Sequence, residues 1–454
     1  MRVSINPCRF SGKVNVPASK SHTIRQLLIA SLADGASEIQ CPLDSLDTRA
    51  CVSVCGAFGA EIIEYRAADA DNSNPQDEKG EKLIGWKISG NNGFKRKIRL
   101  QKNLDVGNSG TTLYLALAVA GLQPEPVEFT GDEQIQRRSA APLLDALTGL
   151  GVWCESNNGC APITIKGPCK GGKVSLPCPT SQYLSALLIA SPLAPAGVVT
   201  EIDVPLLNEK PYIEMTLSYL KAHGIPFQTA LLPSGKPDFS HFVIPGGSSW
   251  KAFSRTVPAD FSSAAFPAAA AAITGGPVTL LGLDPDDTQG DKFFLEMLKL
   301  MGCKVQWSKN GKNGPSLTVS REGPLRGRTF DLNETPDLLP AAAVTAAYAE
   351  GDTALVNVAH ARIKETDRIA VMAVELAKLG VNCTERPDGL VIHGKGTLSP
   401  PEPPVIDGHG DHRIVMAFAA AALGSGSPFE ITDAESAAVT YPGFLDLLGA
   451  QWMD

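Results

Sequence analysis

The sequence predicts an α/β protein of one or two lobes, in which helices lie inside and sheets outside. Six segments each have a polar opening, an apolar stretch rich in Ala and Leu, and a closing glycine, and these glycines recur every 73 to 86 residues. Between them, amphipathic segments end in a glycine followed by a short apolar stretch. Because the first kind of helix is too apolar to face water, the rest of each unit must enclose it.

The apolar helices are expected in residues 19–35, 107–121, 180–197, 260–276, 336–351 and 410–426. The amphipathic helices, each with its following strand, are expected in residues 52–63, 143–155, 217–228, 295–306, 374–385 and 445–452. In this second series the glycine stands where a helix C-cap turns left-handed, and the residues after it suit a strand. Each unit should therefore contain strand, buried helix, strand, exposed helix and strand.

One stretch interrupts the first unit. Residues 66–99 include the run "AADADNSNPQDEKGEK", which is rich in Asp, Asn, Lys and Gly. The composition predicts a long exposed loop or hairpin without a chemical role.

Composition narrows the function. The chain has 454 residues, 43% of them hydrophobic, and a net charge of -8, which argues against general affinity for nucleic acid or anionic membranes. It contains no signal peptide pattern and no apolar run of the roughly 20 residues that a membrane span needs, so we expect a cytoplasmic protein. The ten cysteines have no zinc spacing and are expected to be free thiols, and no metal site is predicted.

Polar residues cluster at the openings of the apolar helices. Helix N-termini carry free N–H groups and a partial positive charge, so they bind anions. Ser, Thr, Asn and Asp there could be ordinary N-caps, but caps do not explain cations, which indicate a site for more than one phosphate or carboxylate. The opening residues are Lys20, Ser21, Arg25, Asn108, Ser109, Gly110, Thr111, Thr180, Ser181, Gln182, Asp260, Ser262, Ser263, Asp337, Asp411, His412 and Arg413.

Two further segments are strongly charged. Arg137 and Arg138 precede one amphipathic helix, and residues 364–368 are expected in the first turns of another, where Lys364 and Glu365 neighbour Arg368. A solvated surface of ion pairs would explain them equally well. The chain has no Rossmann fingerprint, Walker motif or Gly-x-Ser-x-Gly elbow, so its chemistry should depend on Lys, Arg, Glu and Asp.

Seven motifs, in this order, resemble the 5-enolpyruvylshikimate-3-phosphate synthase family of enolpyruvyl transferases: "SKSHTIR", "GNSGTT", "TSQYLSALLIA", "KPYIEMTLSYL", "PDLLPAAAVTAA", "RIKETDR" and "GDHRIVMA". The resemblance spans about residues 11–448. It implies a two-lobed inside-out α/β barrel with six βαβαββ repeats, three per lobe. Residues 1–18 and 259–454 would form the first lobe and 19–258 the second, with the active site between them at the helix N-termini.

The resemblance also implies an activity and its residues. The family transfers the enolpyruvyl group of phosphoenolpyruvate to shikimate 3-phosphate, without a cofactor, and a monomer is expected. Asp337, Glu365 and Lys20 would be catalytic, with the two acids carrying protons. Shikimate 3-phosphate would contact Lys20, Ser21, Arg25, Thr180, Ser181, Gln182, Tyr212, Asp337 and Lys364. Phosphoenolpyruvate would contact Lys20, Gly110, Arg138, Gln182, Arg368 and Arg413.

The sequence departs from the family pattern at four positions. Tyr114 and Val439 stand where the family usually has Arg and Lys, Glu209 stands where Ser is common, and Ser139 replaces a Pro. Loss of a charge-assisted contact costs about 1.5 to 3 kcal/mol, so weak phosphoenolpyruvate binding is expected. Two alternatives remain open: a relative that uses a different hydroxylated acceptor, and a non-catalytic binding protein.

Overall fold

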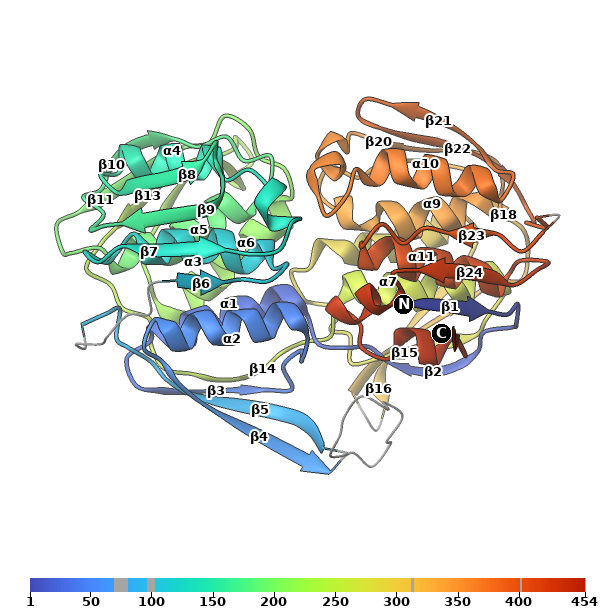
Figure 1. Cartoon of the computed structure of the whole chain (residues 1–454), viewed down its shortest axis with the longest axis horizontal. Coiled ribbons are helices and arrows are strands. Elements are labelled where there is room, and N and C mark those ends of the chain that lie inside the picture. Colours follow the sequence, from blue (N-terminus) through green and yellow to red (C-terminus); the bar gives the residue numbers. More distant parts are fainter. Residues whose placement is uncertain (69–80, 96–102, 312–313, 401, 454) are drawn as a thin grey trace. The chain divides into compact units, whose positions relative to one another are not determined.

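The computed structural model describes residues 1–454 except 69–80, 96–102, 312–313, 401 and 454 (Figure 1). Of the described residues, Met1–Ser19 and those from Pro258 onward form one compact unit, here called unit 1. Those between Lys20 and Val257 form a second, unit 2. None of the described helices is both long and apolar enough to cross a membrane.

The described part of unit 2 contains three four-stranded sheets, ordered β14-β3-β5-β4, β6-β7-β9-β8 and β10-β11-β13-β12. In each sheet the first pair is parallel and the others are antiparallel. The strands are β3 (Ala36–Gln40), β4 (Glu61–Ala68), β5 (Glu81–Ser89), β6 (Asn103–Asp105), β7 (Val127–Thr130), β8 (Trp153–Asn157), β9 (Cys160–Lys166), β10 (Gly172–Ser175), β11 (Val199–Asp203), β12 (Gln228–Leu231), β13 (Pro237–Pro245) and β14 (Ser254–Thr256). The helices are α1 (Lys20–Leu32), α2 (Leu46–Ala57), α3 (Gly110–Ala120), α4 (Ala141–Gly149), α5 (Gln182–Ala190) and α6 (Lys210–His223).

Unit 1 repeats this plan in its described residues, with sheets ordered β2-β15-β17-β16, β18-β20-β22-β21 and β23-β24-β1-β25, and with β19 also paired to β20. The strands are β1 (Arg2–Ile5), β2 (Gly12–Asn15), β15 (Val278–Leu281), β16 (Lys304–Gly311), β17 (Gly314–Ser320), β18 (Leu325–Arg326), β19 (Thr329–Asp331), β20 (Ala349–Val356), β21 (Asn382–Arg386), β22 (Gly389–Lys395), β23 (Val405–Ile406), β24 (Phe429–Thr432) and β25 (Gln451–Met453). The helices are α7 (Phe261–Thr274), α8 (Phe293–Leu300), α9 (Leu339–Ala347), α10 (Arg368–Lys378), α11 (His412–Leu423) and α12 (Phe444–Leu447).

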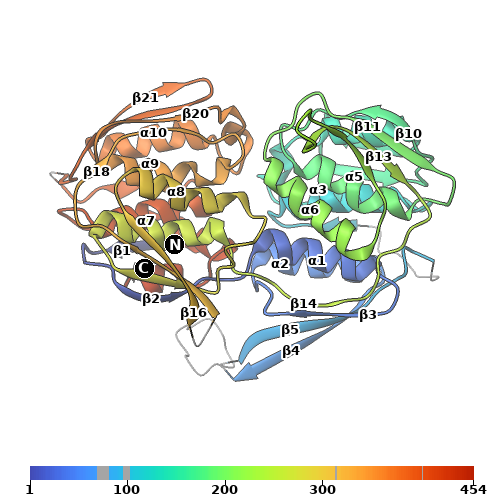
Figure 2. The same cartoon turned by 180° about the vertical axis from the view of Figure 1, so that it is seen from behind.

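The apolar helices form the core of each unit. Every residue of α3, α9 and α11 is buried, and the helices of each unit lie between its strands in both views (Figures 1 and 2). In unit 1, α7, α9 and α11 pack against one another. Helices without a polar face can be stable in water only inside such an enclosure. The fold-class prediction of buried helices, outer sheets and three repeats per lobe is confirmed.

The predicted helix-ending glycines have the conformation that their role requires. After the amphipathic helices, the glycines have φ between 69° and 106°, a region that is costly for residues with a side chain. The six are Gly59, Gly151, Gly224, Gly302, Gly380 and Gly449. This part of the helix prediction is confirmed residue by residue.

The strand pattern read from the residues was incomplete. Each repeat has a fourth strand. In five of the six repeats the chain turns back after the exposed helix and forms a hairpin, as in β12 and β13, and in the sixth the N-terminal strand β1 takes this place beside β25. Three strands also complete repeats that are distant in sequence: β14 pairs with β3, β2 with β15, and β1 lies between β24 and β25. Sequence periodicity does not reveal such non-local pairing.

Residues 66–99 were predicted to form an exposed loop or hairpin. The hairpin is confirmed, because β5 pairs antiparallel with β4, but the exposed part was too wide. Residues 81–89 within it form β5, an inner strand of its sheet, and Trp86 and Ile88 on that strand are fully buried. The charged run hid an apolar alternation that begins at Leu83. Residues 69–80 and 96–99 of the segment lie outside the described residues.

Candidate active site

In unit 1, one arginine joins three carboxylates from three different elements. Arg368 begins α10 and is 1% exposed. Its guanidinium donates to Asp337 Oδ1 at 2.8 Å and to Glu365 Oε2 at 2.5 Å, and its Nε lies 2.7 Å from Asp411 Oδ2. Asp337 lies in a short 3-10 turn, Pro336–Leu338, that precedes α9. Asp411 is the N-cap of α11. The starts of three helices therefore meet at one buried cation.

A second arginine completes this cluster. Arg413 Nη2 lies 2.9 Å from Asp337 Oδ2, so each oxygen of Asp337 faces a different guanidinium. Burial opposes ionisation of Asp337, but the charges of Arg413, Lys364 and Arg368 outweigh it and hold its pKa well below the usual range. Burial also opposes the charge of Arg368, but the negative charges of Asp411, Glu365 and Asp337 outweigh it and raise the pKa of Arg368. Asp337 and Arg368 are therefore both charged at neutral pH.

Two expectations about residues 364–368 were wrong. Helix α10 begins at Arg368, after Lys364 and Glu365, because Asp367 caps it by accepting a hydrogen bond from Ala370 N at 3.0 Å. The group is also not a solvated surface of ion pairs. Only 1% of the Arg368 side chain and 15% of the Glu365 side chain are exposed, so the open alternative of a merely solvated face does not describe this pair.

A further acid adjoins the cluster and was not predicted. Asp291, in the 3-10 turn before α8 (Gly290–Lys292), accepts a short hydrogen bond from Ser262, in the first turn of α7. It is 2% exposed. Burial and the negative charge of Asp337 raise the pKa of Asp291 to about 7. Sequence reasoning listed Ser262 as a helix opening but gave no signal for its acidic partner.

In unit 2, the predicted cation at the start of α1 has an internal counter-ion. Lys20 Nζ lies 3.0 Å from Asp47 Oδ2, and Asp47 belongs to the first turn of α2. Their side chains are 15% and 5% exposed. Asp47 was missed, because an acid in the first turn of a helix is common for reasons of the helix dipole alone. A helix-opening cation therefore does not by itself require a bound ligand.

Arg25 is a predicted site residue of unit 2 that lies deep in its core. It is 1% exposed and donates from Nε to Thr216 Oγ1 at 2.9 Å and from Nη2 to Ser185 Oγ at 3.2 Å. It also reaches the carbonyls of Ser21 and Tyr212 at 3.2 and 3.5 Å. Burial lowers its pKa to about 10. Helices α1, α5 and α6 are thereby joined through one guanidinium.

The start of α5 carries an anion supplied by the chain. Glu209 Oε2 accepts hydrogen bonds from Ser181 Oγ at 2.8 Å, Ser181 N at 3.0 Å and Thr180 Oγ1 at 3.1 Å. Glu209 is 2% exposed, and it is one of the four residues at which the sequence departs from the family pattern. Gln182 follows Ser181 in the sequence, and its side chain donates to Thr111 Oγ1 at 3.1 Å. This hydrogen bond links the openings of α5 and α3.

Gly110 and Arg138 are brought together at the start of α3. A side chain at Gly110 would meet Arg138 Nη1 at 2.8 Å, so only a glycine leaves this position open to the guanidinium. The carbonyl of Ser139 accepts hydrogen bonds from Tyr183 at 2.6 Å and Tyr114 at 3.4 Å. Tyr114 thus supports the backbone beside Arg138 at the position where a cation was expected.

The remaining openings divide into caps and other contacts. Ser109 accepts from Thr112 N and Asp411 accepts from Arg413 N, as N-caps do. Asn108 Nδ2 donates to Asp132 Oδ2 at 2.6 Å, and Ser263 Oγ donates to Asp260 Oδ2 at 2.8 Å. The N-cap interpretation is therefore correct for some openings.

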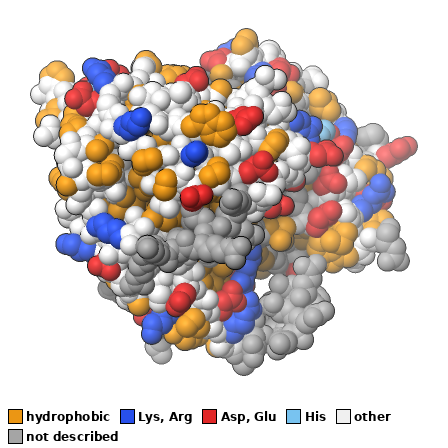
Figure 3. Space-filling model, turned by 60° about the vertical axis from the view of Figure 1, so that its left-hand side comes forward, with side chains coloured by type: hydrophobic (Ala, Val, Ile, Leu, Met, Phe, Trp, Pro, Cys, Tyr) orange, Lys and Arg blue, Asp and Glu red, His pale blue; other side chains and the backbone are white. Residues whose placement is uncertain are grey.

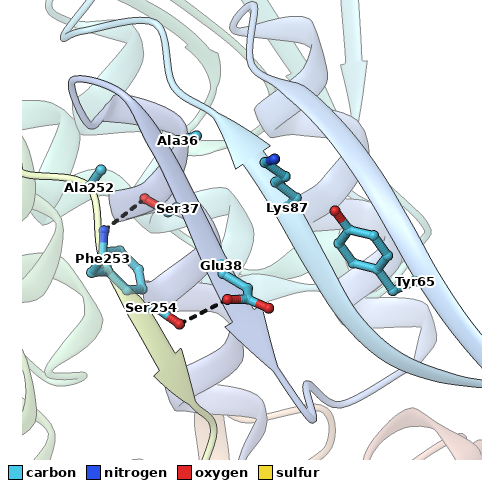
Figure 4. A pocket seen from close by; sticks show the side chains of 8 residues that line it. All are labelled: Ala36, Ser37, Glu38, Tyr65, Lys87, Ala252, Phe253 and Ser254. Atoms are coloured by element: carbon cyan, nitrogen blue, oxygen red, sulfur yellow. Dashed lines mark hydrogen bonds between the residues drawn. The ribbon is translucent and has the colours of Figure 1, made fainter.

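A surface hollow of unit 2 lies away from these residues. A hollow of about 500 Å³ lies over β3, β5 and the segment before β14, where Glu38, Lys87 and Tyr65 are among its lining side chains (Figure 4). None of its lining residues was a predicted site residue. On the face shown in Figure 3, Lys and Arg lie among Asp, Glu and hydrophobic side chains.

The sequence matches the model of a protein family described as EPSP synthase (3-phosphoshikimate 1-carboxyvinyltransferase) over residues 6–448. A protein of Acetivibrio thermocellus named 3-phosphoshikimate 1-carboxyvinyltransferase is 42% identical over 453 residues, which cover 99% of this chain and 97% of that protein. One of the same name from Methanothrix thermoacetophila is 42% identical over 451 residues, covering 98% and 97%. A solved EPSP synthase structure from Acinetobacter baumannii is 28% identical, with a TM-score of 0.78 and 99% of both chains covered.

Proposed function

Because the chain belongs to the EPSP synthase family, we propose that it transfers the enolpyruvyl group of phosphoenolpyruvate to the 5-hydroxyl of shikimate 3-phosphate and releases phosphate. It is thus a transferase of the shikimate pathway, which leads to chorismate and the aromatic amino acids. The observation that carries the assignment of residues is the contact of one buried guanidinium, Arg368, with both Asp337 and Glu365.

The two acids are proposed as the proton carriers. One carboxylate takes the proton from the acceptor hydroxyl, whose oxygen then bonds to C2 of phosphoenolpyruvate. The other, protonated, delivers its proton to the methylene carbon and gives a tetrahedral intermediate. That carboxylate then removes a proton from the new methyl group while the C2–O bond to phosphate breaks. Asp337 and Glu365 suit this work because Arg368 fixes both side chains in one geometry.

The anionic groups of the substrates require cations. Lys20, Gly110, Arg138, Gln182, Arg368 and Arg413 are proposed to contact phosphoenolpyruvate, with Lys20 also assisting catalysis beside the reacting phosphate. For shikimate 3-phosphate the proposed contacts are Lys20, Ser21, Arg25, Thr180, Ser181, Gln182, Tyr212, Asp337 and Lys364. Fixed cations and helix N-termini offset the repulsion between the two acidic metabolites.

Phosphate release from phosphoenolpyruvate tests the proposal, measured with and without shikimate 3-phosphate. We expect release that depends on shikimate 3-phosphate and falls about 10²- to 10⁴-fold in Glu365→Gln and Asp337→Asn. Glu296→Gln is the matched control, since Glu296 is an exposed acid of α8 in the same unit. Release that ignores shikimate 3-phosphate would indicate a different acceptor, and no release at all would indicate a binding protein.

The proposal also covers the domain organisation, the oligomeric state and the location of the protein. We propose that units 1 and 2 are the two lobes of the family, that the protein works as a monomer, and that it acts in the cytoplasm. The acid–base route described above needs no cofactor. Light scattering of the purified chain at micromolar concentration tests the monomer, and a mass of two chains would contradict it.

A further inference from the structure

A buried carboxylate occupies donors that the proposed function assigns to the acceptor. Glu209 Oε2 accepts from the backbone N–H and the hydroxyl of Ser181 and from the hydroxyl of Thr180, all within 3.1 Å. Backbone N–H groups at a helix start, together with hydroxyls, are the usual surroundings of a bound phosphate. In this structure the anion at the start of α5 is a side chain.

Two further observations indicate that the Glu209 carboxylate is held specifically at the start of α5. Glu209 has φ 60° and ψ 42°, a left-handed conformation that is uncommon for residues other than glycine. Such a backbone persists only where its surroundings determine it. In addition, Glu209 is one of the groups whose negative charge acts on Arg25 and opposes the effect of burial on its pKa. The carboxylate is therefore held by α5 on one side and attracted by the Arg25 cation.

We infer that Glu209 is an internal anion that competes with the phosphate group of the acceptor, and so sets the affinity for shikimate 3-phosphate. The inference rests on the proposed function, which assigns Thr180, Ser181 and Arg25 to that substrate. Two anions cannot use the same donors, because like charges at hydrogen-bonding distance repel strongly where water is excluded. Binding of the acceptor must therefore displace the Glu209 carboxylate from Ser181.

The competition should affect one substrate and spare the other. The donors that hold Glu209 belong to Thr180 and Ser181. Gly110 and Arg138, proposed for phosphoenolpyruvate, lie at the start of α3. The side chain of Gln182, proposed for both substrates, donates to Thr111 of α3. Removal of the carboxylate therefore frees the acceptor position without altering these contacts. A general loss of active-site order would instead change both affinities.

Equilibrium binding and steady-state kinetics of Glu209→Ser and Glu209→Gln test the inference. For Glu209→Ser we expect the Kd and KM of shikimate 3-phosphate to fall roughly tenfold or more, with the KM of phosphoenolpyruvate within about twofold of wild type. Glu209→Gln removes the charge but keeps an oxygen that can accept from Ser181, so a smaller fall is expected. The matched control is Glu214→Gln, an exposed glutamate on the same helix, α6, which should change neither constant.

Inorganic phosphate provides a second readout that does not depend on which acceptor the enzyme uses. By calorimetry, Glu209→Ser should bind phosphate more tightly than wild type. Both variants are checked for folding by thermal unfolding, and Glu209→Gln decides the matter if the serine variant does not fold. Shikimate 3-phosphate and phosphate bound no more tightly by the variants than by wild type would overturn the inference. Absence of activity with shikimate 3-phosphate in wild type, combined with tighter phosphate binding in the variants, would instead contradict only the proposed acceptor.

Discussion

Two buried arginines, one in each unit, have opposite surroundings. Arg368 and Arg25 are both 1% exposed. Arg368 contacts three carboxylates of its own unit, whereas Arg25 donates to hydroxyl and carbonyl oxygens. The pKa values follow this difference. Burial lowers that of Arg25 to about 10, whereas the three carboxylates outweigh burial at Arg368 and raise its pKa.

The difference indicates two uses of a buried cation. Arg368 neutralises acids and fixes them in place, which suits proton transfer by Asp337 and Glu365. The charge of Arg25 is solvated by neutral dipoles, so it stays available to an anion, whether Glu209 or a substrate phosphate. Unit 1 would then carry mainly the proton chemistry and unit 2 mainly the recognition of the phosphorylated acceptor.

The largest expected effect comes from exchanging each arginine for methionine. Arg368→Met leaves Asp337, Glu365 and Asp411 without their shared cation, and loss of one partner of a buried ion pair costs about 3 to 5 kcal/mol. Arg25→Met takes a donor from neutral hydrogen-bond acceptors, at a cost of about 1 to 3 kcal/mol, while Glu209 keeps its hydrogen bonds from Thr180 and Ser181. Urea unfolding measures both free energies. Equal losses would show that the two surroundings are equivalent.

Asp291 tests whether negative charge is in excess in the unit 1 cluster. Its pKa is raised from 3.8 to about 7, so the folded protein binds one more proton than the unfolded chain between these pH values. Stability should therefore fall as pH rises through this window. Asp291→Asn has no proton to lose, so its free energy of unfolding relative to wild type should rise by roughly 1 to 4 kcal/mol from pH 4 to pH 8.

The same pair of measurements on Asp145→Asn provides the control for this pH effect. Asp145 is an exposed residue of α4, and its replacement should leave the pH dependence of stability unchanged. A constant difference between Asp291→Asn and wild type across the window would mean that Asp291 is ionised in the folded protein at both pH values.

The helices and strands of both units were more predictable from the sequence than the contacts between them. Apolar helices were identifiable because a helix without a polar face must be buried, and helix-ending glycines because their φ is restricted. The pairing of β14 with β3 and of β2 with β15 was not, because it joins segments more than 200 residues apart. Periodicity within a segment carries no information on such pairs.

The charged residues show the same division. Lys20, Arg25 and Arg413 were identified from their places at helix openings, and Arg368 from the charged segment 364–368. Their partners depend on which helices meet in space. Asp47 was not predicted as a counter-ion, nor Glu209 as the anion at the start of α5. The cations and the family were therefore predictable from the sequence, whereas the internal anions Asp47 and Glu209 were not.

A third prediction concerns the phosphoenolpyruvate contacts proposed in unit 2. In Gly110→Ala the new methyl group would lie 2.8 Å from Arg138 Nη1 and must displace it. Loss of one charge-assisted contact costs about 1.5 to 3 kcal/mol, so the KM of phosphoenolpyruvate should rise roughly 10- to 100-fold. Gly56→Ala is the control, since a methyl group there has nothing within 4 Å. An unchanged KM would remove Arg138 from the proposed site.

The smallest expected effect comes from loosening the backbone beside Arg138 while the charge of Arg138 is kept. Tyr183 donates to the Ser139 carbonyl at 2.6 Å, and Tyr114 donates to the same oxygen at 3.4 Å. Tyr183→Phe removes the shorter bond and should cost about 1 kcal/mol, seen as a rise of up to about fivefold in the KM of phosphoenolpyruvate with kcat preserved. Tyr114→Phe, with the longer bond, should change this KM less. If Tyr114→Phe has the larger effect, then Tyr114 contributes to binding in place of the expected arginine, and recognition of phosphoenolpyruvate in unit 2 depends on more than Arg138.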